Sequence, residues 1–202
     1  MRKDITGIIL CGGKSSRMQT NKALLKFSDK TVIEIVLTEM KKVFDEVFIS
    51  ANDCDDFEFL NIPIVKDIQI HRGPLSGIFS ALKESNTEKN FITTCDLPLI
   101  THQLIDYISN LISEKEIIIP TIYGEVQRLF GIYNKSLIKK IEAIFEQSKV
   151  DKNIKGSIYE LHERASVDNV EITHLAFYND HAFFNMNAPD DYEIIKNIYE
   201  KR

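Results

Sequence analysis

The sequence predicts a three-layer α/β protein in which helices cover both faces of a doubly wound, mostly parallel sheet. Short apolar runs with little alternation recur through the first 120 residues, as in strands that are buried on both faces. Segments with apolar residues at helical spacing separate these runs, and such strand–helix alternation is typical of this fold class. A glycine-rich loop also follows the first apolar run, at the end of a strand where such folds bind ligands.

Five strands and three helices are expected in this first part. The strands are residues 5–10 (ITGIIL), 46–51 (EVFISA), 62–65 (IPIV), 90–95 (NFITTC) and 116–120 (EIIIP). The first helix begins after Thr31, because the sequence T-V-I-E is a capping-box pattern. The second begins within GPLSGIFSALKES, from Gly73, and Thr101 caps the third. The apolar face of the third helix is expected to consist of Leu104, Ile105, Ile108, Leu111 and Ile112.

The pattern is looser beyond residue 120. Residues 125–133 (EVQRLFGIY) are compatible with one strand, and the apolar spacing from Leu137 to Phe145 predicts a helix. We expect a short helix within 157–165, a strand near 170–175 and a last helix from about residue 188. The sequence has no repeat and no flexible linker, so a single domain over residues 1–202 is expected.

The composition favours a soluble protein that binds a small anion. Hydrophobic residues make up 44% of the chain, yet no apolar run approaches the roughly 18 residues that span a membrane. The N-terminal segment, interrupted by Asp4, is a poor signal peptide, so we expect a cytoplasmic protein with no membrane partner. A net charge of −5 argues against a nucleic-acid partner. The three cysteines lack metal spacing and are expected to be reduced thiols.

Residues 10–22, LCGGKSSRMQTNK, form a basic loop that is suited to phosphate. No acidic residue occurs from Ile5 to Ser28. The glycine spacing matches neither the P-loop nor the dinucleotide fingerprint. Adjacent glycines allow close approach of the backbone to a ligand, Arg17 can fork onto phosphate oxygens, and Lys22 can act as a point charge. The alternative is a strand-to-helix turn with a solvated basic face.

The pattern L-x-G-G-x-S-x-R-M-x-x-x-K-A-L-L resembles the opening signature of the molybdenum cofactor guanylyltransferases, which have a Rossmann-like nucleotidyltransferase fold. Five further motifs follow in the family's order, so the resemblance covers most of the chain. They are SAND with Asn52, VKD with Asp67 and GPLSG, TTCDLP with Asp96, and NMNAPDD from Asn185.

The resemblance implies an enzyme that transfers GMP from GTP to the phosphate of molybdopterin and releases pyrophosphate. The implied nucleotide-binding residues are Leu10, Cys11, Gly12, Gly13, Lys22, Asn52, Asp67 and Asp96. Asp96 is the implied Mg²⁺ ligand, and Arg17, Lys22 and Asp96 are the expected catalytic residues. Gly13 favours GTP, since cytidylyl-transferring relatives tend to carry alanine there. The N-terminal half would bind the nucleotide and the C-terminal half the acceptor, with transient contacts to other cofactor-biosynthesis proteins.

The sequence differs from the family pattern at four positions. Gln19 stands where glycine is usual, Asn21 where aspartate is usual, Cys11 where alanine is usual, and Arg128 where proline is common. The absence of a carboxylate at position 21 raises the local positive charge and is expected to alter the orientation of the Lys22 side chain.

The residues alone support a related expectation. The carboxyl ends of parallel strands meet at one edge of a sheet, so the glycine loop, Asn52, Asp67 and Asp96 should share that edge. Mg²⁺ prefers one or two carboxylates plus phosphate oxygens, and Asp96 can supply one. An acceptor phosphate is already ionised at neutral pH, so the enzyme needs no strong base and mainly aligns and screens anions.

Other residues keep two readings. Asn185 and Asn187 would point the same way on a strand and contact the acceptor, or Asn187 merely caps the last helix. His71 and Arg72 either meet the acceptor's phosphate or form a solvated loop. Two other functions also stay open: a relative that uses CTP or a sugar phosphate, and a non-catalytic nucleotide- or cofactor-binding module.

Overall fold

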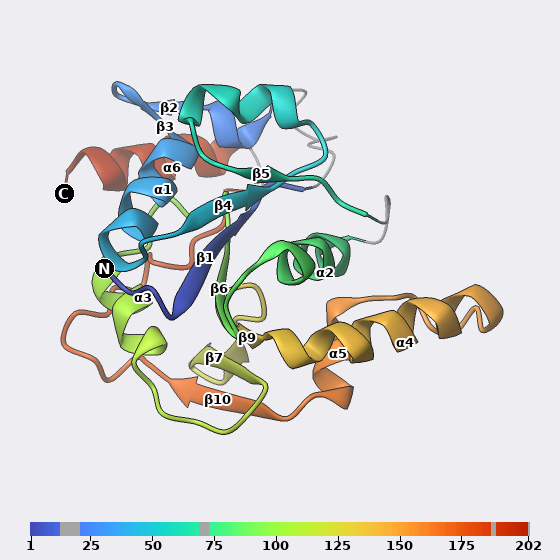
Figure 1. Ribbon diagram of the computed structural model, residues 1–202. Coiled ribbons are helices and arrows are strands. Elements are labelled where there is room, and N and C mark those ends of the chain that lie inside the picture. Colours follow the sequence, from blue (N-terminus) through green and yellow to red (C-terminus); the bar gives the residue numbers. More distant parts are fainter. Residues whose placement is uncertain (13–20, 69–72, 187–188, 202) are drawn as a thin grey trace.

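The computed structural model describes residues 1–12, 21–68, 73–186 and 189–201. The strands of the main sheet are β1 (Ile5–Leu10), β4 (Val47–Ser50), β5 (Ile64–Val65), β6 (Lys89–Thr94), β7 (Ile117–Ile122), β8 (Glu125–Val126), β9 (Gly131–Asn134) and β10 (Val167–Glu171). Their order is β10-β7-β9-β6-β1-β4-β5, and β8 pairs with β7 (Figure 1). A separate hairpin pairs β2 (Lys26–Phe27) with β3 (Lys30–Thr31).

Helices cover both faces of this sheet, which confirms the predicted three-layer α/β fold (Figure 1). The helices are α1 (Val32–Val43), α2 (Pro74–Glu84), α3 (His102–Ser109), α4 (Ile138–Val150), α5 (Ile158–Arg164) and α6 (Pro189–Glu200), with 3₁₀ helices η1 (Lys22–Leu24), η2 (Cys54–Leu60) and η3 (Lys135–Leu137). One large apolar cluster joins α1 and α3 to the sheet, and a second joins α2, α4 and α5 to the opposite face.

The parallel core of the sheet follows the sequence prediction closely. β1 pairs in parallel with both β4 and β6, and β4 pairs in parallel with β5. All six residues of β1 are buried, as the unalternating apolar run predicts. The predicted capping box at the start of α1 is formed, because the Thr31 hydroxyl accepts from the Glu34 N–H while the Glu34 carboxylate accepts from the Thr31 N–H.

The single strand expected over residues 125–133 is wrong. The segment instead forms β8, a turn, and β9, which runs antiparallel to both β6 and β7. Gly131 permits this arrangement because its φ is 145° and a Cβ there would lie 2.2 Å from the backbone oxygen of Ile118. The sheet is therefore mixed, and β9 enters it at the edge where β6 ends.

Two boundaries also differ from the prediction. Helix α3 ends at Ser109, so Ile112 lies beyond it with its side chain fully exposed instead of on an apolar face. The late strand is β10, from Val167 to Glu171, three residues earlier than expected. Asn110 ends α3 because its backbone N–H bonds to carbonyls of the last turn while its side chain bonds to the Asp106 carbonyl.

A third, smaller apolar cluster attaches the C-terminal helix to the hairpin. Phe27 of β2 lies between Tyr192 and Tyr199 of α6, with ring centroids 5.4 and 5.6 Å away. Met186 and Leu99 are fully buried in the same cluster. The segment before α6 is thereby held beside the chain that follows β6. In the described part of the chain, none of the helices has the length and apolar character needed to cross a membrane.

Candidate active site

The ends of four strands bring most of the predicted site residues to one edge of the sheet. β1 leads to Cys11 and Gly12, β4 to Asn52, β5 to Asp67 and β6 to Asp96. Backbone hydrogen bonds continue past the strand ends, since the Cys11 N–H donates to the Ser50 carbonyl at 2.8 Å and the Cys95 N–H to the Leu10 carbonyl at 3.1 Å. The chain leaving β1 is therefore fixed between its two neighbours when it reaches the glycines.

Asp67 is the centre of a hydrogen-bonded group at this edge. Its two carboxylate oxygens accept from the Ser50 hydroxyl at 3.1 Å and from the Asn52 side-chain amide at 3.2 Å. Burial raises the pKa of Asp67, and the hydrogen bonds from Ser50 and Asn52 oppose that rise. Asp67 is thus a positioned, half-buried acid and not a solvated loop residue.

Asn52 carries an unused acceptor. Its side-chain oxygen is buried and has no hydrogen-bond partner among the described residues. A buried acceptor that lacks a donor costs on the order of 1–3 kcal/mol, so such groups usually serve a ligand or a water. Asn52 follows β4, the strand that pairs with β1, and its oxygen is suited to accept from an N–H or O–H group of a nucleoside.

Gly77 in the first turns of α2 lets that helix approach the same group. The Ser50 hydroxyl also contacts the Gly77 carbonyl at 3.3 Å. A Cβ at Gly77 would lie 3.0 Å from the Ser50 oxygen and 3.2 Å from the Leu10 side chain. The GPLSG motif therefore has a packing reason for its second glycine.

Asp96 lies directly after β6 and joins the two halves of the chain. The Thr94 hydroxyl donates to one of its carboxylate oxygens. Its backbone oxygen accepts from the Met186 N–H at 3.2 Å. Asn185, the residue before Met186, is exposed. The segment around Met186 is irregular, so the strand-like alternation considered for Asn185 and Asn187 is not formed at the described positions.

Cys11 and Cys95 are neighbours on adjacent strand ends, and both pack on the same apolar cluster. Burial, followed by the Cys95 thiol and the Asp96 carboxylate, raises the pKa of the Cys11 thiol. All three cysteines are free, as predicted. Cys11 therefore remains an uncharged thiol that fills space where the family usually has alanine.

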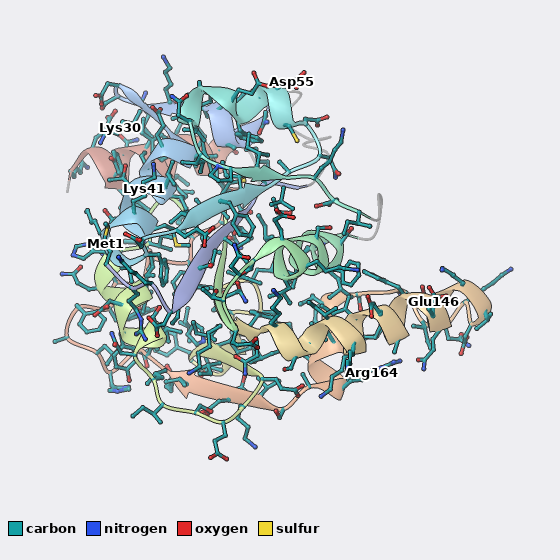
Figure 2. All side chains as sticks on the ribbon, viewed as in Figure 1. Met1, Lys30, Lys41, Asp55, Glu146 and Arg164 are labelled. Atoms are coloured by element: carbon teal, nitrogen blue, oxygen red, sulfur yellow. The ribbon has the colours of Figure 1, made fainter. Side chains whose placement is uncertain are left out.

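Lys22 begins the 3₁₀ helix η1, and Asn21 caps it. The Asn21 side-chain oxygen accepts from the Ala23 N–H at 3.2 Å, while its amide donates to Asp56 at 2.7 Å. Asparagine and aspartate cap helices about equally well, so the cap is retained. Asp56 of η2 supplies a carboxylate beside position 21, and Figure 2 labels its neighbour Asp55 on the same 3₁₀ helix.

Several predicted residues lie outside the described part of the chain. They are Gly13, Arg17, Gln19, His71, Arg72 and Asn187. Among the described residues, no three His, Cys, Asp or Glu side chains gather in the way an all-protein metal site requires.

The sequence analysis missed Ser50, Thr94 and Asp56, each of which positions a predicted residue through one hydrogen bond. Ser50 had a signal in the sequence, since it is a polar residue near the end of the apolar run EVFISA. Thr94 had a weaker signal, two residues before Asp96. Asp56 could not have been found, because its pairing with Asn21 joins segments 35 residues apart.

Curated relatives match almost the whole chain. A probable molybdenum cofactor guanylyltransferase of Carboxydothermus hydrogenoformans is 31% identical over 199 residues, which is 98% of this chain and 98% of the relative. Another protein of that description, from Natranaerobius thermophilus, is 35% identical over 96% of this chain and 95% of its own length.

Solved structures give the same fold. A putative protein from Aquifex aeolicus superposes with a TM-score of 0.75 at 31% identity, covering 91% of this chain and 93% of that one. Molybdopterin-guanine dinucleotide biosynthesis protein A from Archaeoglobus fulgidus superposes with a TM-score of 0.81 at 21% identity, over 98% of this chain and all of that one. At that identity the second likeness supports the fold alone.

A protein-family model also matches the chain. The model of the MobA-like NTP transferase domain matches residues 7–165, which contain the glycine loop, Asn52, Asp67 and Asp96. Together with relatives above 30% identity over nearly the full length, this match confirms the resemblance drawn from the sequence motifs. The chain therefore belongs to the family of MobA-like NTP transferase domains.

Proposed function

We propose that this protein is a Mg²⁺-dependent guanylyltransferase, which joins GMP from GTP to the phosphate of molybdopterin and releases pyrophosphate. The observation that carries the proposal is the convergence of Gly12, Asn52, Asp67 and Asp96 on one sheet edge, with Asn185 brought there by the Met186–Asp96 bond. The names of the curated relatives support the same substrates.

The N-terminal half is proposed to bind the nucleotide. Gly12 leaves room above the end of β1, since nothing in the described part lies within 4 Å of where its Cβ would be. Asn52 and Asp67 belong to one hydrogen-bonded group, and the unused Asn52 oxygen and the Asp67 carboxylate can accept hydrogen bonds from a nucleoside. Lys22, held at the start of η1, supplies positive charge for the phosphates. Arg17 and Gly13 remain predictions for that role.

The residues fit a magnesium ion shared with the nucleotide. Thr94 donates to one Asp96 oxygen, and none of the described residues forms a hydrogen bond with the other. A single carboxylate matches the habit of Mg²⁺, which takes one or two carboxylates and fills its other positions with phosphate oxygens and waters. When bound, the ion would neutralise charge on the triphosphate.

The transfer step requires little acid–base chemistry from the protein. An oxygen of the acceptor's phosphate attacks the α-phosphorus of GTP, the bond from that phosphorus to the β-phosphate oxygen breaks, and pyrophosphate leaves. The acceptor phosphate is already an anion at neutral pH, so no proton has to be removed. The protein aligns the two anions and screens their repulsion, which can contribute a large share of the rate.

Pyrophosphate release measured with GTP, CTP and ATP against molybdopterin tests the proposal. We expect release with GTP only. Release with CTP alone would overturn the guanine assignment, and binding of GTP without release from any nucleotide would show a non-catalytic module.

Asp96 gives the sharper test of mechanism. Replacing Asp96 with Asn removes the carboxylate and keeps the shape, so turnover should fall by at least ~100-fold, the size expected for loss of a metal-dependent stabilisation of several kcal/mol. The thermal midpoint should stay close to that of the wild type, because the backbone bond to Met186 is unaffected. Undiminished turnover in this variant would remove Asp96 from its role.

A further inference from the structure

An arginine in the C-terminal half is held by an aromatic ring. The Arg128 guanidinium carbon lies 4.5 Å from the ring centroid of Tyr159. Arg128 belongs to the turn between β8 and β9, and Tyr159 lies in the first turn of α5. Stacking on tyrosine attracts a guanidinium group and fixes its plane.

Arg128 has no acidic partner in the described part of the chain. The salt bridges there involve other cations, and the Arg128 side chain forms no hydrogen bond with the described residues. Its Nε–H group is buried and has no acceptor. A positioned guanidinium with an unsatisfied, desolvated donor is costly, and an incoming anion would relieve that cost.

Two neighbours of Arg128, Tyr133 and His162, are neutral. The Tyr133 hydroxyl donates to the Arg128 carbonyl and lies 2.9 Å from His162 Nε2. Since the tyrosine proton is used, His162 must donate from Nε2, which makes its ring the neutral Nε2–H form. Burial, followed by the charge of Arg128, lowers the pKa of His162 to about 4. Arg128 thus supplies an uncompensated positive charge in this cluster.

The topology places this cluster at the edge that carries Asp96. β9 begins where the antiparallel β6 ends, so the turn with Arg128 lies at that edge. α5 leads into β10, which runs parallel to β7, and its first turn reaches the β8–β9 turn through the contact between Tyr159 and Arg128. The hydrogen bond from Gln127 N–H to the Pro120 carbonyl anchors the turn on β7.

We propose that Arg128, stacked on Tyr159, forms an anion subsite that binds a phosphate group of the acceptor. The identity of the acceptor rests on the function proposed above, while the anion chemistry rests on the contacts of Arg128. The guanidinium fork suits a phosphate monoester, because two parallel N–H groups can meet two oxygens. Lysine could supply the charge but not the fork.

Steady-state kinetics of three variants tests the subsite. Replacing Arg128 with Gln should raise the KM for molybdopterin by about 10- to 100-fold, as expected for loss of a charge-assisted hydrogen-bonded pair, with the KM for GTP changed less than twofold. Replacing Arg128 with Lys should recover part of the loss. Replacing Tyr159 with Leu should raise the KM for molybdopterin severalfold, because the charge remains and only its orientation is lost.

Arg164 offers a matched control on the same helix. It is an exposed arginine of α5 that bonds to the neutral Gln147 side chain at 2.7 Å (Figure 2). The Arg164→Gln variant removes the same charge and should leave both KM values at the wild-type level. An increase for molybdopterin as large as that in Arg128→Gln would show a general charge effect and overturn the subsite.

Equilibrium binding separates this inference from the proposed function. Wild type saturated with an α,β-methylene analogue of GTP is titrated with inorganic phosphate, which is expected to bind at least tenfold more weakly to Arg128→Gln. Wild type that releases no pyrophosphate from any nucleotide, yet shows this difference, would refute the guanylyltransferase but keep the subsite. If the wild type turns over and the Arg128→Gln variant keeps the wild-type KM for molybdopterin and the wild-type affinity for phosphate, the subsite alone is refuted.

Discussion

At the scale of single residues, the position of Asp67 depends on neighbours that donate to it. Ser50 shares its hydroxyl between Asp67 and the Gly77 carbonyl, and Asn52 holds the second oxygen of Asp67. The close approach of α2 at Gly77 keeps this group compact. Shape at position 77 should therefore affect nucleotide binding more than folding.

Replacing Gly77 with Ala tests that separation. The new methyl group would crowd the Ser50 oxygen at 3.0 Å. The Ser50 side chain must then rotate and lose its hydrogen bond to Asp67 or to the carbonyl of residue 77. Alanine in a helix gains about 1 kcal/mol over glycine, which offsets the crowding in the stability of the fold. We expect the KM for GTP to rise about 5- to 20-fold, equivalent to about 1–2 kcal/mol, with a thermal midpoint within a few degrees of wild type. A large fall in the midpoint with unchanged KM would contradict this view.

His162 gives the fold a dependence on pH. Its pKa falls from 6.5 to about 4 on folding, mainly through burial. The unfolded chain binds the extra proton between these values, so the stability that the neutral ring contributes is present at pH 7 and is lost as the pH falls from 6.5 toward 4. The loss should be on the order of 2 kcal/mol, since partial exposure screens part of the shift.

Urea denaturation at several pH values measures this loss. The His162→Gln variant keeps a donor for Tyr133 but does not titrate, so its stability should fall less between pH 7 and pH 4 than that of wild type. If the free energy of unfolding fell equally with pH in the two proteins, His162 would not be the cause of the loss of stability in acid.

At the scale of elements, local signals in the sequence predicted what is local in the structure. The six buried residues of β1 and the capping box at Thr31 needed only a strand period and a cap pattern. The convergence of Asn52, Asp67 and Asp96 was also predictable, because parallel topology alone brings strand ends together. Their hydrogen-bond partners were not, since those depend on side-chain packing.

The direction of β9 was not predictable in this way. A run such as EVQRLFGIY fits one strand as well as two. The choice depends on the close fit of Gly131 against the Ile118 carbonyl of the neighbouring strand β7. The hairpin β2–β3 was missed because each of its strands has two residues and is stabilised by Tyr192 and Tyr199 of α6. Tertiary contacts decide both elements.

The cap of α1 supports a prediction about helix stability. Replacing Thr31 with Ala removes the acceptor for the Glu34 N–H and should destabilise the protein by about 1 kcal/mol. Thr38 in the same helix is exposed, and its hydroxyl donates to the Glu34 carbonyl, so Thr38→Ala should change stability by less than ~0.5 kcal/mol. Chemical denaturation of both variants makes the comparison, and equal losses would show that the cap adds nothing specific.

At the scale of the whole molecule, the two halves of the chain share one sheet. β9 of the C-terminal half lies between β6 and β7, and Phe91 of β6 packs edge-on against Phe130 at 4.9 Å between ring centroids. The proposed nucleotide-binding and acceptor-binding halves are therefore parts of one sheet with a shared core. Both large apolar clusters contain residues from the two halves.

A fragment of residues 1–112 should consequently fail to fold. It would expose the edge of β6 and the apolar faces that α4 and α5 cover, and exposed edges and faces favour aggregation. We expect no cooperative thermal transition for the fragment by circular dichroism, and recovery of one when residues 113–202 are refolded with it. A cooperative fragment that binds GTP like the intact protein would show an independent nucleotide-binding domain.

The contact between Asp96 and Met186 has a consequence for how the reaction centre tolerates change. It uses the carbonyl of one residue and the amide of the other, 90 positions further along the chain, and neither atom belongs to a side chain. Substitutions at either position can thus alter the side-chain chemistry or the packing without removing this backbone hydrogen bond. The carboxylate and the C-terminal segment can be redesigned independently and still remain side by side.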